Sequence, residues 1–240
     1  MIALFLLVAA QTYGQQNFYG RVRIEYEKTV NPLALYKELD EEWFNFVKES
    51  TPQVVTSYCE FIGDTLHSDY HLLKEAQIPP GKRYDAFADN NNIYMDYKAG
   101  TTVSQKPVFE ETFLIQDSLV NIKWKLTNDT RTIAGFDCRK AIGTILDSVT
   151  VFAFYTDELL VPGGPESIHG LPGMILGVGI PRLHTTWFAT RVEVSGVNEG
   201  KIVPASKGKK TSRQDMQQAL IRVLNDWGTY GKKLVLNFLI

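Results

Sequence analysis

Cysteine is scarce in this sequence. The 240 residues contain only two, Cys59 and Cys138, which excludes a small scaffold held together by several disulfides. Both lie in strand-like segments and are candidates for a single disulfide in an oxidising compartment. The alternative is that both are small buried hydrophobic residues.

An excess of charge of one sign is also lacking. The chain has 25 Lys and Arg against 27 Asp and Glu, a net charge of −2. We therefore expect no general attraction to nucleic acid or to an anionic lipid surface. The local basic run at residues 207–213 is interpreted as a solvated loop before a helix, with a binding patch as the alternative.

Long hydrophobic runs are absent beyond the N-terminus, so no membrane span is expected. The run at residues 2–10 has the length of a signal peptide, and Thr12 and Gly14 supply the small residues that a signal peptidase requires. We expect residues 1–14 to be a signal peptide cleaved before Gln15, with a buried strand or helix as the alternative. The protein would then be exported, periplasmic or outer-membrane-associated, with residues 15–240 forming a single domain.

The motifs of common catalytic sites are missing as well. The sequence contains no serine nucleophile elbow, no phosphate-binding loop and no zinc-protease helix. The carboxylate pairs Glu41–Glu42 and Glu110–Glu111 are adjacent in sequence and are typical of solvated element edges. We expect no catalytic residues and no cofactor.

The four histidines do not form a metal-ligand pattern. His67 and His71 share one face of a strand, at about 13 Å from each other, which is too far for one metal ion. His169 and His184 flank a glycine-rich stretch and could converge with nearby acidic residues, namely Asp157, Glu158 and Glu166. No ligand spacing supports a metal site. Because these side chains could still converge in the fold, a hydrolase or metal-dependent enzyme of the envelope is kept as an alternative.

Strand patterns dominate the rest of the chain. Val22, Ile24 and Tyr26 alternate with charged residues, which predicts a half-buried strand. Further strands are expected at residues 53–63 and 65–73 around Asp64, 93–106 with a turn at Ala99–Gly100, 108–117, 122–126, 130–146, 148–157, 185–203 as two strands around residues 196–198, and 232–240. The pattern predicts a mainly β fold with a few helices (α+β), a curved antiparallel sheet or partly open barrel with helices packed on one side.

Two helices are expected. The first begins at Asp40 and places Trp43 and other apolar residues on one face. The second begins at a capping box formed by Ser212 and Asp215 and ends at Gly228. Its apolar stripe, expected to pack on the sheet, consists of Met216, Ala219, Leu220, Val223, Leu224 and Trp227.

Glycine and proline are concentrated between residues 163 and 181. Glycine permits positive φ and proline fixes φ near −65°, which predicts a reversal at residues 163–165 and a type I or II turn at 170–173. We expect a long rigid loop whose apolar tip, residues 174–176, fills the concave face of the sheet. The loop is either a structural lid or the lining of a binding site formed by Gly164, Pro165, Gly170, Leu171, Pro172, Gly173, Met174 and Ile175.

Several motifs occur in a fixed order: Trp124, the segment 135–138, the aromatic segment 154–156, Gly164–Pro165 and the hexapeptide GLPGMI at residues 170–175. Together they resemble the GLPGLI family of exported Bacteroidetes proteins, with Met174 in place of leucine and Phe154 in place of tryptophan. The resemblance implies a secreted envelope protein of unknown biochemical role, encoded near outer-membrane nutrient receptors, with no established catalytic residues. Through the phylum it also implies O-glycosylation at Asp-Ser/Thr-apolar motifs, whose hydroxyls are Thr65, Ser118 and Ser148.

These observations predict a non-enzymatic binding or partner-docking module of the cell envelope. Its expected partner is an outer-membrane receptor or an apolar or peptide ligand, and no oligomeric state is predicted. The enzyme described above is one alternative, and a structural or assembly factor for the outer membrane is the other.

Overall fold

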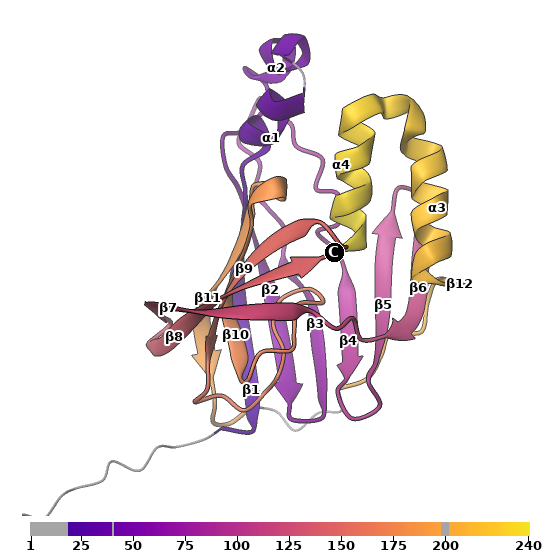
Figure 1. Cartoon of the computed structure of the whole chain (residues 1–240). Helices are drawn as coiled ribbons and strands as arrows, with labels where there is room; N and C mark the ends of the chain where they lie inside the picture. The colour runs from indigo at the N-terminus through magenta and orange to yellow at the C-terminus, as the bar shows by residue number, and fades with distance from the viewer. Residues whose placement is uncertain (1–18, 40, 198–201) are drawn as a thin grey trace, which may run out of the picture.

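A single curved β-sheet organises the protein. The computed structural model describes residues 19–39, 41–197 and 202–240, so the expected signal peptide and the predicted cap Asp40 lie outside the described residues. The sheet has 12 strands in the order β12-β6-β5-β4-β3-β2-β1-β11-β10-β9-β8-β7, and it is open and strongly curved (Figure 1). The mainly β class and the antiparallel curved sheet are confirmed, because only the β12–β6 pair within the described sheet is parallel.

The strands are β1 (Arg21–Val30), β2 (Val55–Asp64), β3 (His67–Lys74), β4 (Asn92–Asp96), β5 (Thr101–Val108), β6 (Glu111–Ser118), β7 (Lys123–Ile133), β8 (Phe136–Ile145), β9 (Val149–Thr156), β10 (Met174–Ile180), β11 (Thr185–Glu193) and β12 (Lys209–Thr211). The helices are α1 (Pro32–Leu39), α2 (Glu41–Val47), α3 (Arg213–Leu224) and α4 (Gly228–Leu239), with short 3₁₀ turns η1 (Pro181–Leu183) and η2 (Asn225–Trp227). No described helix is long and apolar enough to cross a membrane.

Strand β1 lies in the middle of the sheet, and its side chains alternate between buried and partly exposed positions as the sequence pattern predicts. Every second side chain from Val22 to Val30 is buried, and β1 pairs with β2 on one side and β11 on the other. The expected hairpins β2–β3 and β4–β5 are present, and Gly100 has a φ of 68° in the second turn, a conformation that glycine adopts without strain. Local patterning therefore predicted this half of the sheet.

The second helix was predicted correctly at its start and incorrectly along its length. Ser212 caps α3, because its Oγ accepts a hydrogen bond from the Asp215 amide at 3.0 Å. The predicted stripe divides: Met216, Leu220 and Leu224 are buried, whereas Val223 and Trp227 are exposed. Gly228 does not end the helical region, since it has a φ of 59° and redirects the chain into α4.

The strand predicted at residues 232–240 is wrong, because that segment is part of α4. Gly231, Leu234, Val235 and Phe238 are its buried residues, and they follow the spacing i, i+3, i+4 and i+7 of one helix face. This face packs with α3 on Val108 and Phe113 in a second hydrophobic core. A short apolar run does not distinguish strand from helix by itself, and contact with α3 decides the outcome.

The second strand predicted after residue 196 lies largely outside the described residues. Asn198 lies outside the described residues, and the described residues 202–207 contain no strand. Instead β12 forms within the basic run that was predicted to be a loop, and it pairs Lys209 with Phe113 of β6. The run therefore contributes backbone pairing at the edge of the sheet, and Lys209 also lies 3.1 Å from Glu111.

The glycine-rich stretch is a loop followed by an inner strand. Residues 174–176 do fill the core, with all three side chains 0 % exposed, but they begin β10, which pairs with β9 and β11. Gly173 has a φ of 140°, and a side chain there would collide with the Thr156 carbonyl. The turn is tighter than the expected type I or II turn, because the Gly173 amide donates to the Leu171 carbonyl at 2.8 Å.

The disulfide considered above is not formed, and Cys59 and Cys138 are buried free thiols. They lie on β2 and β8, which are separated by four other strands in the sheet. Burial raises the pKa of each thiol to about 12, so the nucleophilic thiolate is disfavoured.

We expect both thiols to react with a thiol reagent such as Ellman's reagent only after unfolding, and to do so without prior reduction. A denatured mass two daltons below that of the dithiol would contradict this expectation.

A buried lysine makes stability depend on pH. Lys106 of β5 is 3 % exposed, and its Nζ donates to the Phe238 carbonyl in the last turn of α4 at 3.0 Å. Burial lowers the pKa of Lys106 from 10.5 to about 8, against the opposing charge of Glu166. Between these two pKa values only the unfolded chain holds the proton, so the contribution of Lys106 to the free energy of unfolding rises with pH.

We therefore expect Lys106→Met to remove a rise of about 1–3 kcal/mol in the free energy of unfolding between pH 7 and pH 10. Urea unfolding of the wild type and the variant at both pH values measures the difference. Lys98→Met, a change at an exposed turn residue, is the matched control and should leave the pH dependence as it is. Equal pH dependence in all three proteins would show that the Lys106 proton is not linked to folding.

Candidate functional site

The glycine-rich loop is anchored by a buried group of charges that the sequence analysis did not identify. Lys28 of β1 is 3 % exposed, and its Nζ lies 2.7 Å from Asp89 Oδ1 and 3.8 Å from Glu166 Oε1. Lys28 also lies over the Trp187 ring, 5.3 Å from its centroid. Burial alone would lower the pKa of Lys28, but the charges of Asp89 and Glu166 outweigh it and hold this pKa above its usual value.

Glu166 connects this group to the loop. Its Oε2 accepts from Asn91 Nδ2 at 3.0 Å, and its Oε1 accepts from the Tyr70 hydroxyl at 3.5 Å. Glu166 has a φ of 54°, a left-handed conformation that is unfavourable for residues other than glycine. The ion pair and hydrogen bonds therefore hold a strained residue in the concave interior, and with it the loop between β9 and β10.

The residues proposed to line a binding loop are mostly inaccessible. All of them are buried except Gly170 and Pro172, and none lines the cleft described below. Trp124 Nε1 of β7 donates to the His169 carbonyl at 2.9 Å, which ties the loop to the edge of the sheet. Of the two alternatives, this burial supports the structural lid.

The histidines do not converge. His169 is buried, and burial lowers its pKa, whereas His184 Nε2 lies 2.8 Å from Glu38 Oε1. Asp157 pairs with Arg139 and Glu166 pairs with Lys28. The described residues contain no group of three or more His, Cys, Asp or Glu able to hold a metal ion, so the alternative in which these histidines and acids converge has no support there.

The histidines of β3 have separate partners. His71 Nδ1 lies 2.7 Å from Asp69 Oδ2, and this hydrogen bond raises the pKa of His71. His67 Nε2 lies 3.7 Å from Asp96 Oδ2. The three hydroxyls considered for modification, Thr65, Ser118 and Ser148, are exposed at the ends of strands.

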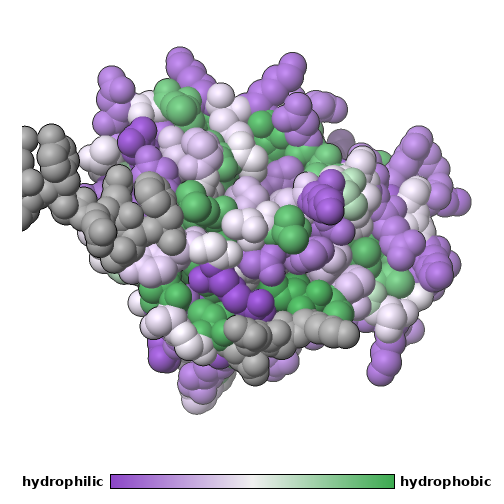
Figure 2. Space-filling view, turned by 90° about the horizontal axis from the view of Figure 1, so that it is seen from below, coloured by the Kyte–Doolittle hydropathy of each residue, from purple (hydrophilic) through white to green (hydrophobic). Residues whose placement is uncertain are grey.

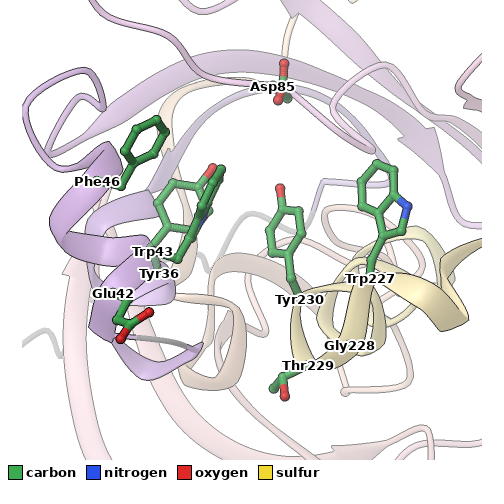
Figure 3. A pocket seen from close by; sticks show the side chains of 9 residues that line it. All are labelled: Tyr36, Glu42, Trp43, Phe46, Asp85, Trp227, Gly228, Thr229 and Tyr230. Carbon is green, nitrogen blue, oxygen red and sulfur yellow. The ribbon is translucent and has the colours of Figure 1, made fainter.

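A large hollow lies between the helices at one end of the sheet. It is a cleft with a volume of about 1010 Å³, and α2 and the α3–α4 connection stand on opposite sides of it (Figure 1). We call it the aromatic cleft, because its lining residues are Tyr36, Glu42, Trp43, Phe46, Asp85, Trp227, Gly228, Thr229 and Tyr230. Figure 3 shows the rings on both sides, with Asp85 at one rim and Glu42 at the other.

The two walls of the cleft hold their rings in different ways. On one wall Trp227 and Tyr230 are stacked, with centroids 6.2 Å apart and an interplanar angle of 6°. On the other wall Trp43 and Phe46 lie 5.6 Å apart, and Phe46 is 78 % exposed. The described part of α2 has no buried residue, so the second wall is accessible to a ligand. At the opposite end of the molecule, hydrophobic residues lie scattered among hydrophilic ones (Figure 2).

Local sequence gave only part of this site. Trp43 was expected on an apolar helix face, and Trp227 was assigned to a packed stripe, but no sequence signal joined the two. For the buried group, a signal did exist: Lys28 is in phase with Val22, Ile24 and Tyr26, so the period-two pattern placed a charge among core residues.

The ion pair between Lys28 and Asp89 is expected to be important for folding. Asp89→Asn removes the nearer of the two carboxylates, at 2.7 Å from Lys28, and leaves only Glu166 at 3.8 Å to balance the buried charge, so it should lower the free energy of unfolding by about 3 kcal/mol. Asp129→Asn is the matched control, because Asp129 pairs with Lys140 at 3.1 Å with 65 % of its side chain exposed; its cost should stay below about 1 kcal/mol. Chemical denaturation of both variants measures the difference, and equal costs would refute the expectation.

Comparison with solved structures shows a related fold. Two structures of PNGF-II, in two space groups, align with a TM-score of 0.53 and 14 % sequence identity. Each alignment covers 83 % of this chain but only 33 % and 32 % of the PNGF-II chains, so the protein spans about a third of their length. A search of curated protein sequences found no match.

A family model also matches the sequence. It is described as "N-glycanase peptide, N-terminal domain" (PNGase F-II), and it covers residues 81–215. This finding overturns the assignment to the GLPGLI family, because Trp124, residues 135–138 and the hexapeptide at 170–175 all lie inside the matched region. Since the model covers more than half of the 240 residues, the chain belongs to the PNGase F-II N-terminal domain family.

Proposed function

We propose that this protein is a non-enzymatic module of the cell envelope that binds the glycan of a glycopeptide in the aromatic cleft. The observation that carries the proposal is the lining of the cleft, in which five aromatic rings accompany the carboxylates of Glu42 and Asp85. A sugar ring has faces of C–H groups and an edge of hydroxyls. Aromatic faces carry partial negative charge and attract such C–H groups, and carboxylates are strong acceptors for hydroxyl donors.

The relatives support a glycan as the ligand. The family and the solved structures are named for an N-glycanase, and a glycan is the substrate that this name implies for those proteins. This chain aligns with about a third of PNGF-II, so we take only the class of ligand from these relatives and not the activity of the whole protein. The exposed hydrophobic rings of α2 are consistent with a surface that is covered by a ligand.

The cellular setting belongs to the same proposal. The hydrophobic run at residues 2–10 supports export, and a module that binds glycopeptides would act in the periplasm or at the outer membrane. We also propose that the protein docks to an outer-membrane receptor. Modification is proposed at three hydroxyls that are exposed to solvent, those of Thr65, Ser118 and Ser148. A structural role in envelope assembly would need no ligand in the cleft, which separates the two functions experimentally.

Titration with a glycopeptide that carries one N-linked glycan, and with the same peptide without the glycan, tests the proposal by calorimetry. We expect saturable binding of the glycopeptide only, and at least tenfold weaker binding by Trp43→Ala and by Trp227→Ala, since tenfold corresponds to about 1.4 kcal/mol and stacking contributes about that much.

Leu126→Ala is the matched control, because Leu126 is 53 % exposed on β7, outside the residues that line the cleft. Equal binding of both peptides would identify a peptide ligand instead. Absence of binding to either would leave the cleft without a glycan function.

A further inference from the structure

The aromatic cleft is built from two parts of the chain that are far apart in sequence. Tyr36 comes from α1 and Tyr230 from α4, and their rings approach to 5.9 Å between centroids. Both residues line the cleft, so this contact joins its two walls. The width of the cleft therefore depends on how α1 is held against α4.

One carboxylate joins these two helices close to that contact. Glu38, two residues after Tyr36, has Oε2 2.7 Å from Lys233 Nζ of α4. Its other oxygen, Oε1, lies 2.8 Å from His184 Nε2, a contact that becomes an ion pair when the imidazole is protonated. The hydrogen bond from Lys233 and the charge of His184 lower the pKa of Glu38, so this carboxylate is ionised at neutral pH.

The backbone of His184 is held in place by hydrogen bonds on both sides. His184 follows η1, has a φ of 49°, and its amide donates to the Pro181 carbonyl at 2.9 Å. The His184 carbonyl accepts from the Asn31 amide at 3.0 Å, directly before α1. Glu38 thus ties α1 to α4 by a hydrogen bond from Lys233, and it adds a charge contact with His184, whose backbone already holds the start of α1 at the junction between β10 and β11.

The outer part of this wall, helix α2, is the part with the least burial. The described part of α2, which continues from α1, has no buried residue, and segments without buried contacts open at low free-energy cost. A half-exposed ion pair adds little to global stability. It can nevertheless select one arrangement of two elements that are otherwise weakly coupled, and so reduce the ordering cost of binding.

We infer that Glu38 is a positioning residue that fixes the width of the aromatic cleft by joining α1 to α4 through Lys233 and to the sheet through His184. This inference rests on the proposed function of the cleft as a ligand site. Loss of the Glu38 charge separates the walls and weakens ligand binding, with little change in the stability of the fold.

The test compares Glu38→Gln, Lys233→Met and the charge reversal Glu38→Lys with Lys233→Glu, using the glycopeptide above as the probe. The single variants should bind about tenfold more weakly, with nearly unchanged melting temperatures. The charge reversal should recover only the part of the affinity that depends on the pair with residue 233, because a lysine at position 38 cannot pair with His184. Glu41→Gln is the matched control, because Glu41 is exposed on α2 and does not line the cleft. A purely structural role of Glu38 would lower the melting temperature and leave the affinity of the folded protein intact, which would overturn the inference.

Two outcomes separate this inference from the proposed function. If Trp43→Ala weakens binding and Glu38→Gln does not, the cleft binds its ligand and the positioning role is wrong. If the wild type does not bind the probe, amide hydrogen exchange decides: the inference holds only if Glu38→Gln accelerates exchange within residues 32–39 and not in β1.

Discussion

The interior of this protein depends on the burial of a positive charge at the centre of a curved sheet. Lys28 occupies a position on β1 that the strand pattern assigns to the core, and two carboxylates from distant loops, Asp89 and Glu166, neutralise it. Such a pair contributes little net stability compared with apolar packing, but an unpaired buried charge is very costly. Both loops must therefore reach the concave face before the sheet is stable. The constraint explains why Glu166 tolerates a left-handed backbone.

The same constraint positions the outer features. With the loop between β9 and β10 held inside, β10 enters the middle of the sheet, and η1 directs His184 toward α1. The loop that carries Asp89 also carries Asp85, which lines the aromatic cleft. The cleft is consequently an extension of the interior network and not an isolated surface feature. The helices carry the aromatic side chains that line the cleft, and the sheet and its loops determine the positions of these helices.

The sequence was sufficient wherever structure is set by neighbours along the chain. Alternation specified β1, the Ala99–Gly100 turn specified the β4–β5 hairpin, and the Ser212 cap specified the start of α3. It was insufficient where packing partners decide. Residues 232–240 are apolar enough for a strand, and only contact with α3 makes them helical. The cleft unites residues near positions 40 and 230, and no local period encodes that proximity. The family resemblance failed for a related reason: short shared motifs describe a loop and its turn, which different families can contain.

The position of β1 has a consequence for how the chain acquires its structure. On one side β1 pairs with β2, which follows closely in sequence, but on the other side Arg23 pairs with Glu193 and Val30 with Thr185. Closing so long a loop costs conformational entropy before any contact repays it, and folds dominated by such pairings form slowly. During synthesis one edge of the central strand therefore stays open until β11, which ends at Glu193, has been made. An open, half-apolar edge can pair with other chains, so a chaperone that shields this edge would protect the chain until β11 is available.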